Sequence, residues 1–395
     1  MSMDDKKKDH LSDLPEVIIE NIFSTISSED LYYNVRRTSR LFAKYLCVES
    51  PYWSLRNRRY RSFIPLDTGK PIANNFHTKV AVKLEKIISN VNDGYKNIIT
   101  KPHTATITVS KIYKPIQERL FCVTGSRDRA ICLQDFEPYR YSDDSDYETT
   151  FIKVDNAHEG WISSICFKDN FIVSNGWDSR LKIWSLTDSG LNIVTSMKGT
   201  SAYLDCAIDN NTIYCCGYEK AVAMFDFRER LKLTNRLFLH SHSILKVLTE
   251  PGSNYLYSIG GDENIVLFDK RTMKIVSNKK LEDATYCVAL YNESLYVSKS
   301  DGSIDYMKVN SLEDMGNIII DDDNHSIEIK NMLIDDGYIA YSRNHINDLH
   351  LYTLCETPRE ISRFQSSTSI CSFGINNGDI VFSEGSAQLH TYLGK

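Results

Sequence analysis

A unit of about forty residues recurs seven times through the last three-quarters of the chain, and this repetition limits the possible folds more than any other feature. In the clearest copy, residues 175–186 run from a turn at Gly176 into alternating Leu181, Ile183 and Trp184, the pattern of a half-buried strand. The positions equivalent to Trp184 are Gln134, Trp184, Phe225, Phe268, Met307, Tyr352 and Tyr392. They are spaced 39 to 50 residues apart, so the unit keeps its length around the whole array.

A turn acid and a loop histidine recur with this unit. Six residues before the Trp184-like position, five of the seven copies carry an acid: Asp128, Asp178, Glu219, Asp262 and Asp301. Such an acid belongs in the tight turn between two strands, where it accepts hydrogen bonds. Three copies also carry a histidine four residues before an isoleucine, at His103, His158 and His240. The sequence therefore predicts a mainly β fold, with a seven-bladed β-propeller over residues 95–395.

The closure of the ring can also be predicted. The last copy ends at Tyr392, so blade seven lacks its outer strand. An open strand edge invites association, and propellers close their ring with a strand from elsewhere in the chain. The only strand-like run before the first copy is residues 95–101, which we expect to pair beside residues 387–392.

The recurring acid and histidine resemble the WD-repeat family, whose blades are braced by an Asp, a His, a Ser or Thr and a Trp. Copy two is the most similar, with His158, Asp178 and Trp184. The resemblance implies that these three residues, together with His103, Asp128, Glu219, His240, Asp262 and Asp301, have a structural bracing role. A Ser/His/Asp catalytic triad is the alternative, but catalysis needs one activated nucleophile at one place, and this pair recurs. With no Gly-rich phosphate loop or metal-ligand spacing, we expect no enzyme activity, cofactor or metal.

A small helical unit precedes the repeats, over residues 11–60. Pro15 suits a first helical position, Ser27 and Ser39 suit N-caps of two further helices, and Pro51 ends the third. The apolar stripe of the first helix is wider than one face. Its surplus packs either inside this unit and against the next domain, or against a partner protein.

The pattern of this helical unit resembles the F-box. The similarity lies in Leu-Pro-Glu-Val-Ile-Ile-Glu-Asn-Ile-Phe at 14–23, Ser-Ser-Glu-Asp-Leu at 27–31, Ser-Arg-Leu-Phe at 39–42, and Trp53. F-box domains dock on the Skp-type adaptor of cullin-RING ubiquitin ligases. The resemblance implies that the adaptor-binding residues here are Leu14, Pro15, Ile18, Ile22, Phe23, Leu31 and Val35.

The remaining segments are less informative. We expect residues 1–10 to be disordered and residues 61–94 to form a linker that packs on the propeller, with a short amphipathic run at 80–88. The basic run 56–61 is interpreted as a solvated linker face, with a nuclear-import signal as the alternative. The acidic insert 139–150 is interpreted as a solvated loop, with a kinase site at Ser142 or Ser145 as the alternative.

Composition narrows the class of protein. The net charge of −6 disfavours a nucleic-acid binder, which needs a basic surface. No signal region or run of eighteen apolar residues is present, so we expect no membrane association and a cytoplasmic and/or nuclear location. The ten cysteines contain no Cys-x-x-Cys pair and are interpreted as reduced, mostly buried thiols.

The rim of the ring is the candidate recognition surface, because loops at one end of the blades converge around the central opening. The residues just before the turn acids, and those that open the inner strands, should reach it. They are Arg127, Trp161, Trp177, Tyr203, Tyr218 and Tyr286. Clustered aromatic and arginine side chains dominate binding energy at interfaces, although each could instead pack between blades.

Together these features predict the substrate-recognition subunit of a Skp-cullin-F-box ubiquitin ligase. The F-box would bind the adaptor, and the propeller rim would bind an unknown substrate protein. Ubiquitin transfer would be performed by other subunits. A non-degradative WD-repeat scaffold is the alternative.

Overall fold

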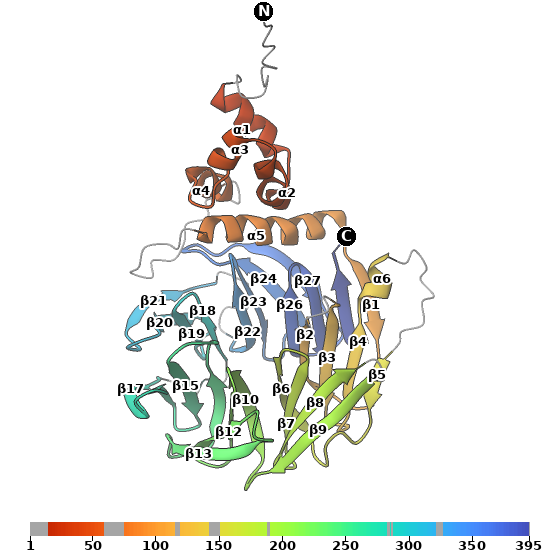
Figure 1. The fold of residues 1–395 in the computed structure, drawn as a ribbon, viewed down its shortest axis with the longest axis vertical. Coiled ribbons are helices and arrows are strands. Elements are labelled where there is room, and N and C mark those ends of the chain that lie inside the picture. Colours follow the sequence, from red (N-terminus) through yellow and green to blue (C-terminus); the bar gives the residue numbers. More distant parts are fainter. Residues whose placement is uncertain are drawn as a thin grey trace, which may run out of the picture.

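The computed structural model describes residues 15–58, 75–114, 119–141, 151–187, 190–282, 285, 287–320 and 327–394. A small helical head lies at one end, a long helix lies beneath it, and a ring of sheets forms the rest (Figure 1). The helices of the head are α1 (Glu16–Ser24), α2 (Ser28–Tyr33), η1 (Val35–Arg37), α3 (Arg40–Tyr45) and α4 (Pro51–Asn57). The long helix is α5 (Phe76–Asp93).

The ring consists of seven four-stranded antiparallel sheets, which confirms the seven-bladed propeller. Blade one contains β2 (Ile107–Tyr113), β3 (Phe121–Ser126), β4 (Ile131–Asp135) and β5 (Phe151–Val154), with the short helix α6 (Glu137–Tyr141) between its last two strands. Blade two contains β6 (Ile162–Lys168), β7 (Phe171–Gly176), β8 (Arg180–Thr187) and β9 (Gly190–Lys198). Blade three contains β10 (Tyr203–Asp209), β11 (Thr212–Gly217), β12 (Ala221–Asp226) and β13 (Lys232–Phe238). Blade four contains β14 (Ile244–Leu248), β15 (Tyr255–Gly260), β16 (Asn264–Asp269) and β17 (Lys274–Lys280).

Blade five contains β18 (Val288–Tyr291), β19 (Ser294–Ser298), β20 (Ile304–Lys308) and β21 (Asp314–Ile318). Blade six contains β22 (Ile329–Asp335), β23 (Tyr338–Arg343), β24 (Asp348–Thr353) and β25 (Glu360–Gln365). Blade seven contains β26 (Ile370–Asn376), β27 (Asp379–Glu384), β28 (Leu389–Leu393) and β1 (Lys96–Thr100).

The Trp184-like positions occupy one structural position, the third strand of each blade. Trp184 lies opposite Ile172, and Phe268 lies opposite Leu256. The second strands are the most deeply placed: Phe121–Ser126 and Tyr338–Arg343 are buried at every residue. Both faces of such a strand contact neighbouring blades, so its sequence reads as a continuous apolar and small-residue run.

Blade seven is completed by the strand that precedes blade one. β1 pairs antiparallel with β28, with Asn97 opposite Tyr392 and Thr100 opposite Leu389. This is the pairing expected from the missing outer strand. The ring is thereby held by main-chain hydrogen bonds between segments almost three hundred residues apart.

Helix α5 replaces the irregular linker that the sequence suggested. It spans 18 residues and buries Val80, Leu84 and Ile87 on one side. The sequence showed only the short amphipathic run at 80–88, because the helix has no side-chain N-cap and its polar residues are mixed among the apolar ones. Of the predicted linker, residues 61–74 lie outside the described residues, as do residues 1–10.

Helix α5 lies across turns of blades six and seven at one face of the ring. Lys83 contacts Asp335 and Asp336 at 2.7 and 2.9 Å, and Asn90 donates to the carbonyl of Gly378 at 3.3 Å. These partners lie in the turns between the first and second strands of each blade. Because the strands of a blade are antiparallel, the turns between its second and third strands, which carry the turn acids, lie at the opposite face.

Part of the acidic insert is ordered. Tyr139, in α6, is buried with Phe136 against the ring, and Arg140 contacts Asp379 at 2.5 Å. The prediction of a solvated loop is therefore wrong for Tyr139 and Arg140. Residues 142–150, which include Ser142 and Ser145, lie outside the described residues.

Candidate functional site

Blade two contains a four-residue brace built from strands β7 and β8, the turn between them and the loop that enters the blade. His158 Nδ1 lies 2.9 Å from Asp178, and its Nε2 lies 2.8 Å from the hydroxyl of Ser174. Trp184 donates its indole N–H to the same hydroxyl at 2.8 Å. Burial alone would raise the pKa of Asp178, but the hydrogen bond and charge of His158 outweigh it and lower the pKa. Both ring nitrogens of the buried His158 therefore have a partner.

The brace recurs in blades one and four without the tryptophan. His103 bridges Asp128 at 3.0 Å and the hydroxyl of Thr124 at 2.9 Å. His240 bridges Asp262 at 2.9 Å and the hydroxyl of Ser258 at 2.9 Å, in the same way. In each of these braces the histidine also contacts a hydroxyl group on the second strand of the blade. The residues that supply it, which the sequence analysis did not assign, are Thr124, Ser174 and Ser258.

Other blades replace the brace with different polar contacts. In blade three, Glu219 contacts Arg236 at 2.7 Å and accepts from Thr200 at 2.6 Å. In blade five, Asp301 accepts from the hydroxyl and the N–H of Ser303. Neither acid has a recorded contact with a histidine in the described parts of the chain. Glu219 and Asp301 therefore make polar contacts within their own blades that differ from the histidine brace of blades one, two and four.

Blade seven contains a buried carboxylate that the repeat pattern did not reveal. Glu384 accepts from Ser367 at 2.6 Å and Ser386 at 3.0 Å, and its carboxylate lies against Nε2 of His390. Burial would raise the pKa of Glu384, but these hydroxyl groups outweigh it and lower the pKa to about 2. Burial lowers the pKa of His390.

Acid is expected to destabilise the ring. The pKa of Glu384 and that of Asp262 are each about 2, below their ordinary values of 4.5 and 3.8. Because both carboxyl groups have a lower pKa in the folded state, each stabilises the folded ring. This stabilisation is complete at a pH above the ordinary pKa and is lost as the pH falls toward about 2. Thermal unfolding followed from neutral to acidic pH should show this loss. Glu384→Gln should make the midpoint less dependent on pH, whereas exposed Glu159→Gln should not.

Three exposed aromatic side chains lie in a row on the rim opposite α5. Trp161 and Trp177 have ring centroids 5.2 Å apart, and Trp177 and Tyr218 have centroids 5.7 Å apart. Their exposed fractions are 41%, 45% and 52%. The guanidinium of Arg127 lies over Trp161 at 4.6 Å, which is a cation–π contact. We call Trp161, Trp177 and Tyr218 the aromatic row.

The backbone sets the position of this row. The N–H of Trp177 donates to the carbonyl of Trp161 at 2.8 Å, and equivalent bonds join Tyr218 to Ala202 and Arg127 to Thr106. A Cβ added at Gly176 would lie 2.5 Å from the Trp161 carbonyl oxygen, so this close approach requires glycine. Four of the six predicted rim residues are thus brought together across blades one to three.

The prediction for Tyr203 is wrong. Its side chain is only 4% exposed and packs with Phe225 between blades, and burial raises its pKa. Tyr203 pairs with Gly217 as Ile162 pairs with Gly176, so Ala202 is the equivalent of Trp161. A shift of one residue along a strand turns the side chain to the other face. Tyr286 lies outside the described residues.

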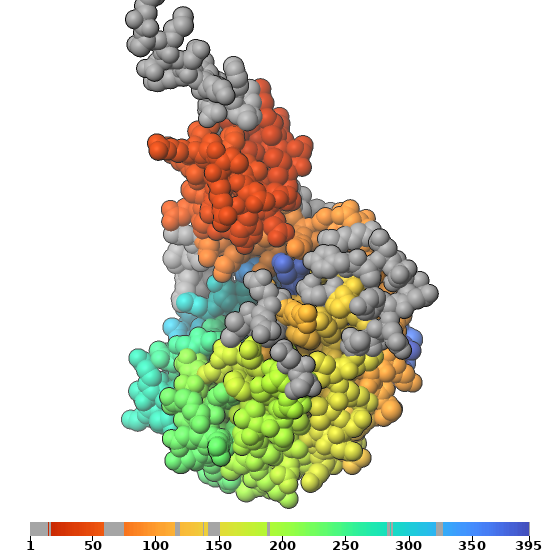
Figure 2. Space-filling model, turned by 45° about the vertical axis from the view of Figure 1, so that its right-hand side comes forward, coloured from red at the N-terminus to blue at the C-terminus, as the bar shows by residue number. Residues whose placement is uncertain are grey.

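The head carries an exposed apolar surface on α1. Val17, Ile18 and Ile22 are 66%, 43% and 38% exposed, and Pro15 is also exposed. α1 is the helix of the head farthest from the ring, and the head stands clear of the ring as a separate lobe (Figures 1 and 2). The ring therefore leaves this surface uncovered.

The other predicted adaptor-binding residues belong to the core of the head. Phe23 and Leu31 are 2% and 0% exposed, and Val35 packs on the same core. The prediction that Phe23 and Leu31 contact the adaptor directly is corrected, because both side chains are covered by the core that includes Phe42 and Trp53. Leu14 lies outside the described residues. Solvent-exposed Leu41, at 39%, is a further apolar residue on the head that the prediction omitted.

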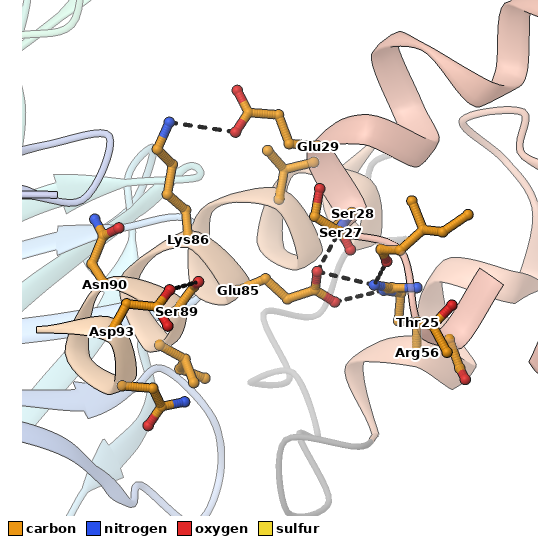
Figure 3. Close-up of a pocket in the computed structure, with 15 residues that line it drawn as sticks. Thr25, Ser27, Ser28, Glu29, Arg56, Glu85, Lys86, Ser89, Asn90 and Asp93 are labelled. Carbon is orange, nitrogen blue, oxygen red and sulfur yellow. Dashed lines mark hydrogen bonds and ion pairs between the residues drawn. The ribbon is translucent and has the colours of Figure 1, made fainter. Parts of the chain in front are cut away.

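Arg56 joins the head to α5. The side chain was predicted to be solvated, but only 4% of it is exposed. Its guanidinium contacts Glu85 at 2.5 and 3.0 Å (Figure 3) and donates to the carbonyls of Phe23 and Ile26 at 2.8 and 2.6 Å. Glu85 also accepts from the N–H of Ser28 at 2.7 Å. Arg59–Arg61, the rest of the basic run after Arg58, lie outside the described residues, so the nuclear-import alternative stays untested.

The described helices include none with the length and apolarity that crossing a bilayer requires. No family model matches the chain. A solved structure, the computationally designed Ika8 protein, has a TM-score of 0.60 and 13% identity, and the match covers 76% of this chain and all of that one. At this identity the likeness concerns the fold alone.

Curated relatives share sequence with about half of the chain. The chain is 27% identical over 226 residues to the F-box/WD repeat-containing protein mec-15 of Caenorhabditis elegans, which is 55% of this chain and 54% of that protein. It is 26% identical over 188 residues to F-box/WD repeat-containing protein 9 of Homo sapiens, which is 47% of this chain and 40% of that protein. The chain thus spans about half the length of these relatives or less. The seven-bladed ring behind a small helical head, taken with these relatives, supports an F-box/WD-repeat protein.

Proposed function

We propose that this protein is the substrate-recognition subunit of a Skp-cullin-F-box ubiquitin ligase. The head binds the Skp-type adaptor through α1, and the rim of the propeller holds the protein to be modified. Other subunits transfer ubiquitin. This chain holds a lysine of its client close to the partner enzyme that carries the ubiquitin. It acts in the cytoplasm, the nucleus or both.

The observation that carries the proposal is the apolar surface of α1. The head already has a complete core around Trp53, which is fully buried, so Val17, Ile18 and Ile22 are not needed to fill it. Exposed apolar side chains gathered on one helix mark a protein interaction site. Their position on the side of the head away from the ring leaves room for a partner as large as an adaptor.

The aromatic row is the proposed client-binding surface. Trp, Tyr and Arg are the residue types that most often dominate binding energy at protein interfaces. Here Arg127 contacts Trp161, Trp161 contacts Trp177, and Trp177 contacts Tyr218 along one rim. The head is attached at the opposite face, so the client and the adaptor do not compete for space.

The adaptor surface can be tested with Ile18→Asp/Ile22→Asp. We expect co-purification of the Skp-type adaptor to fall at least about tenfold, because a charge at each position must be desolvated in the interface. The matched control is Ile193→Asp/Val194→Asp, on outer strand β9, where the side chains are 52% and 54% exposed. Equal adaptor recovery from the α1 variant and the wild type would reject the α1 surface as the interface.

The client surface can be tested with Trp161→Ala/Trp177→Ala. Both side chains are exposed, so the ring should keep its thermal midpoint while losing clients. The measurement is quantitative mass spectrometry of the ubiquitinated proteins that are recovered together with the assembled ligase. The set that depends on the wild-type rim should be lost with this variant and kept with Phe238→Ala, an exposed aromatic on β13. An unchanged set would exclude the aromatic row as the client site.

The non-degradative scaffold stays the second candidate, because the aromatic row serves either function. The two differ in the consequence of binding. A client of the ligase gains ubiquitin in a manner that Ile18→Asp/Ile22→Asp abolishes, whereas a scaffold partner stays bound and unmodified.

A further inference from the structure

The centre of the ring contains a cavity of about 470 Å³. It is lined by inner strands of the blades, including β2, β14, β18, β22 and β26. Its size lies in the range of small-molecule sites, roughly 300–1,000 Å³. The cavity is separate from the α1 surface and from the aromatic row.

Three lysines from different blades line this cavity. They are Lys111 on β2, Lys246 on β14 and Lys330 on β22, and each side chain is partly buried. Among the described residues that line the cavity, none is acidic. Asp205 lies 3.9 Å from the Lys246 ammonium, and its oxygens also accept from Ser164 and the N–H of Val247. Asp205 is thus an acidic neighbour of Lys246, and it lies outside the lining of the cavity.

The contacts within the ring use only part of this lysine chemistry. Lys111 donates to the carbonyl of Ile165 at 2.7 Å, and Lys330 donates to the carbonyl of Ile370 at 3.1 Å. Each bond ties one blade to the next, but a carbonyl does not neutralise the charge. An ammonium group has three donors, so one such bond leaves the others for a ligand. An anion bound in the cavity would be attracted to the ammonium charges that line it.

We propose that the central channel binds a compact polyanion, a small molecule that carries two or more phosphate groups. The ammonium groups of Lys111, Lys246 and Lys330 hold the phosphate oxygens from three sides of the channel. Phe167, Leu290 and Met332 form apolar wall beside them. These side chains cannot solvate charge, so the anionic part of the ligand lies at the lysines.

The test is a calorimetric titration of the full chain with inositol hexakisphosphate and with inorganic pyrophosphate. We expect binding of both, with a rise in thermal midpoint. Lys111→Met/Lys330→Met should weaken binding by about tenfold for each lysine removed. The control is Lys198→Met/Lys274→Met, which makes the same charge change on the exposed outer strands β9 and β17.

Two outcomes would overturn the proposal. One is that the wild-type chain does not bind either probe at millimolar concentration. The other is that Lys111→Met/Lys330→Met and the control Lys198→Met/Lys274→Met weaken probe binding equally, which would indicate non-specific attraction. Without ligand, Lys111→Met/Lys330→Met should unfold at a somewhat lower temperature than the wild type, because it loses the two bonds to the carbonyls of Ile165 and Ile370, so binding is compared at a temperature where both proteins are folded. If it does not fold, single Lys330→Met gives the same comparison.

Discussion

Arg56→Ala is expected to cost about 3–5 kcal/mol of the free energy of unfolding of the head, because it breaks a buried ion pair by removing one of its two members. Glu85 is 15% exposed and would lose both of its contacts with the guanidinium. The carbonyls of Phe23 and Ile26 would also lose a charged donor. Burial lowers the pKa of Arg56, but the hydrogen bond and charge of Glu85, together with Tyr52, outweigh it and raise the pKa, so Arg56 stays charged throughout the physiological range.

Denaturant unfolding and amide hydrogen exchange would measure this effect. Amides of α1–α4 should exchange faster in Arg56→Ala, while those of the seven blades should keep their protection. Lys86→Met is the matched control on α5, since it breaks a partly exposed ion pair with Glu29 at 3.4 Å (Figure 3). Such a pair contributes about 0–1 kcal/mol. Equal losses in the two variants would show that Arg56 does not hold the head to α5.

The functional consequence is separate from the loss of stability. α5 is fixed to the ring through Lys83 and Asn90, and Arg56 fixes the head to α5. Arg56→Ala is therefore expected to loosen the orientation of the head relative to the rim. Small-angle scattering of the full chain should then show a broader distribution of distances than for Lys86→Met.

Asp178→Ala is the second change with a large expected effect, also about 3–5 kcal/mol. Asp178 is 2% exposed, and its carboxylate holds His158 and accepts the N–H groups of Glu159 and Arg180. The substitution leaves buried donors without acceptors at the loop and the turn of blade two. Because Trp177 directly precedes Asp178, the aromatic row should also become less ordered.

The equivalent position in blade three supplies the control. Glu219→Ala removes a contact between Glu219, which is 21% exposed, and Arg236, which is 32% exposed. Its expected cost is about 1 kcal/mol of the free energy of unfolding. Chemical denaturation would compare the two variants, with tryptophan fluorescence reporting the rim. If Asp178→Ala cost no more than Glu219→Ala, the buried brace in blade two would not be a major source of stability.

The repeat could be predicted from the sequence because it depends on residues close together in the chain. A strand pair with its turn places the Asp178-like acid six residues from the Trp184-like position, and this spacing survives even where the aromatic residue does not. The head was predictable for the same reason, since helical spacing and the serine N-caps at Ser27 and Ser39 are local. The apolar surplus of α1 was visible as a stripe wider than one face.

The errors arise where the position of one residue depends on another element. Tyr203 was assigned to the rim because the inner strand seemed to begin one residue away from its true register, and that register is set by pairing with Gly217. Phe23 and Leu31 were assigned to the interface because a motif does not distinguish core from surface. Arg56 was read as part of a charged run, since Glu85 lies 29 residues further along the chain.

The sequence by itself determined the seven-fold repeat, its closure by residues 95–101, and the helical head with an apolar surplus. All three follow from periodicity, which reports the contacts that each residue makes with its neighbours in sequence. Only the tertiary structure decided that α5 joins the head to the ring, that Trp161, Trp177 and Tyr218 form one row, and that three lysines meet in the channel. These features require segments from different blades or domains to meet in space, and local spacing carries no information about such contacts.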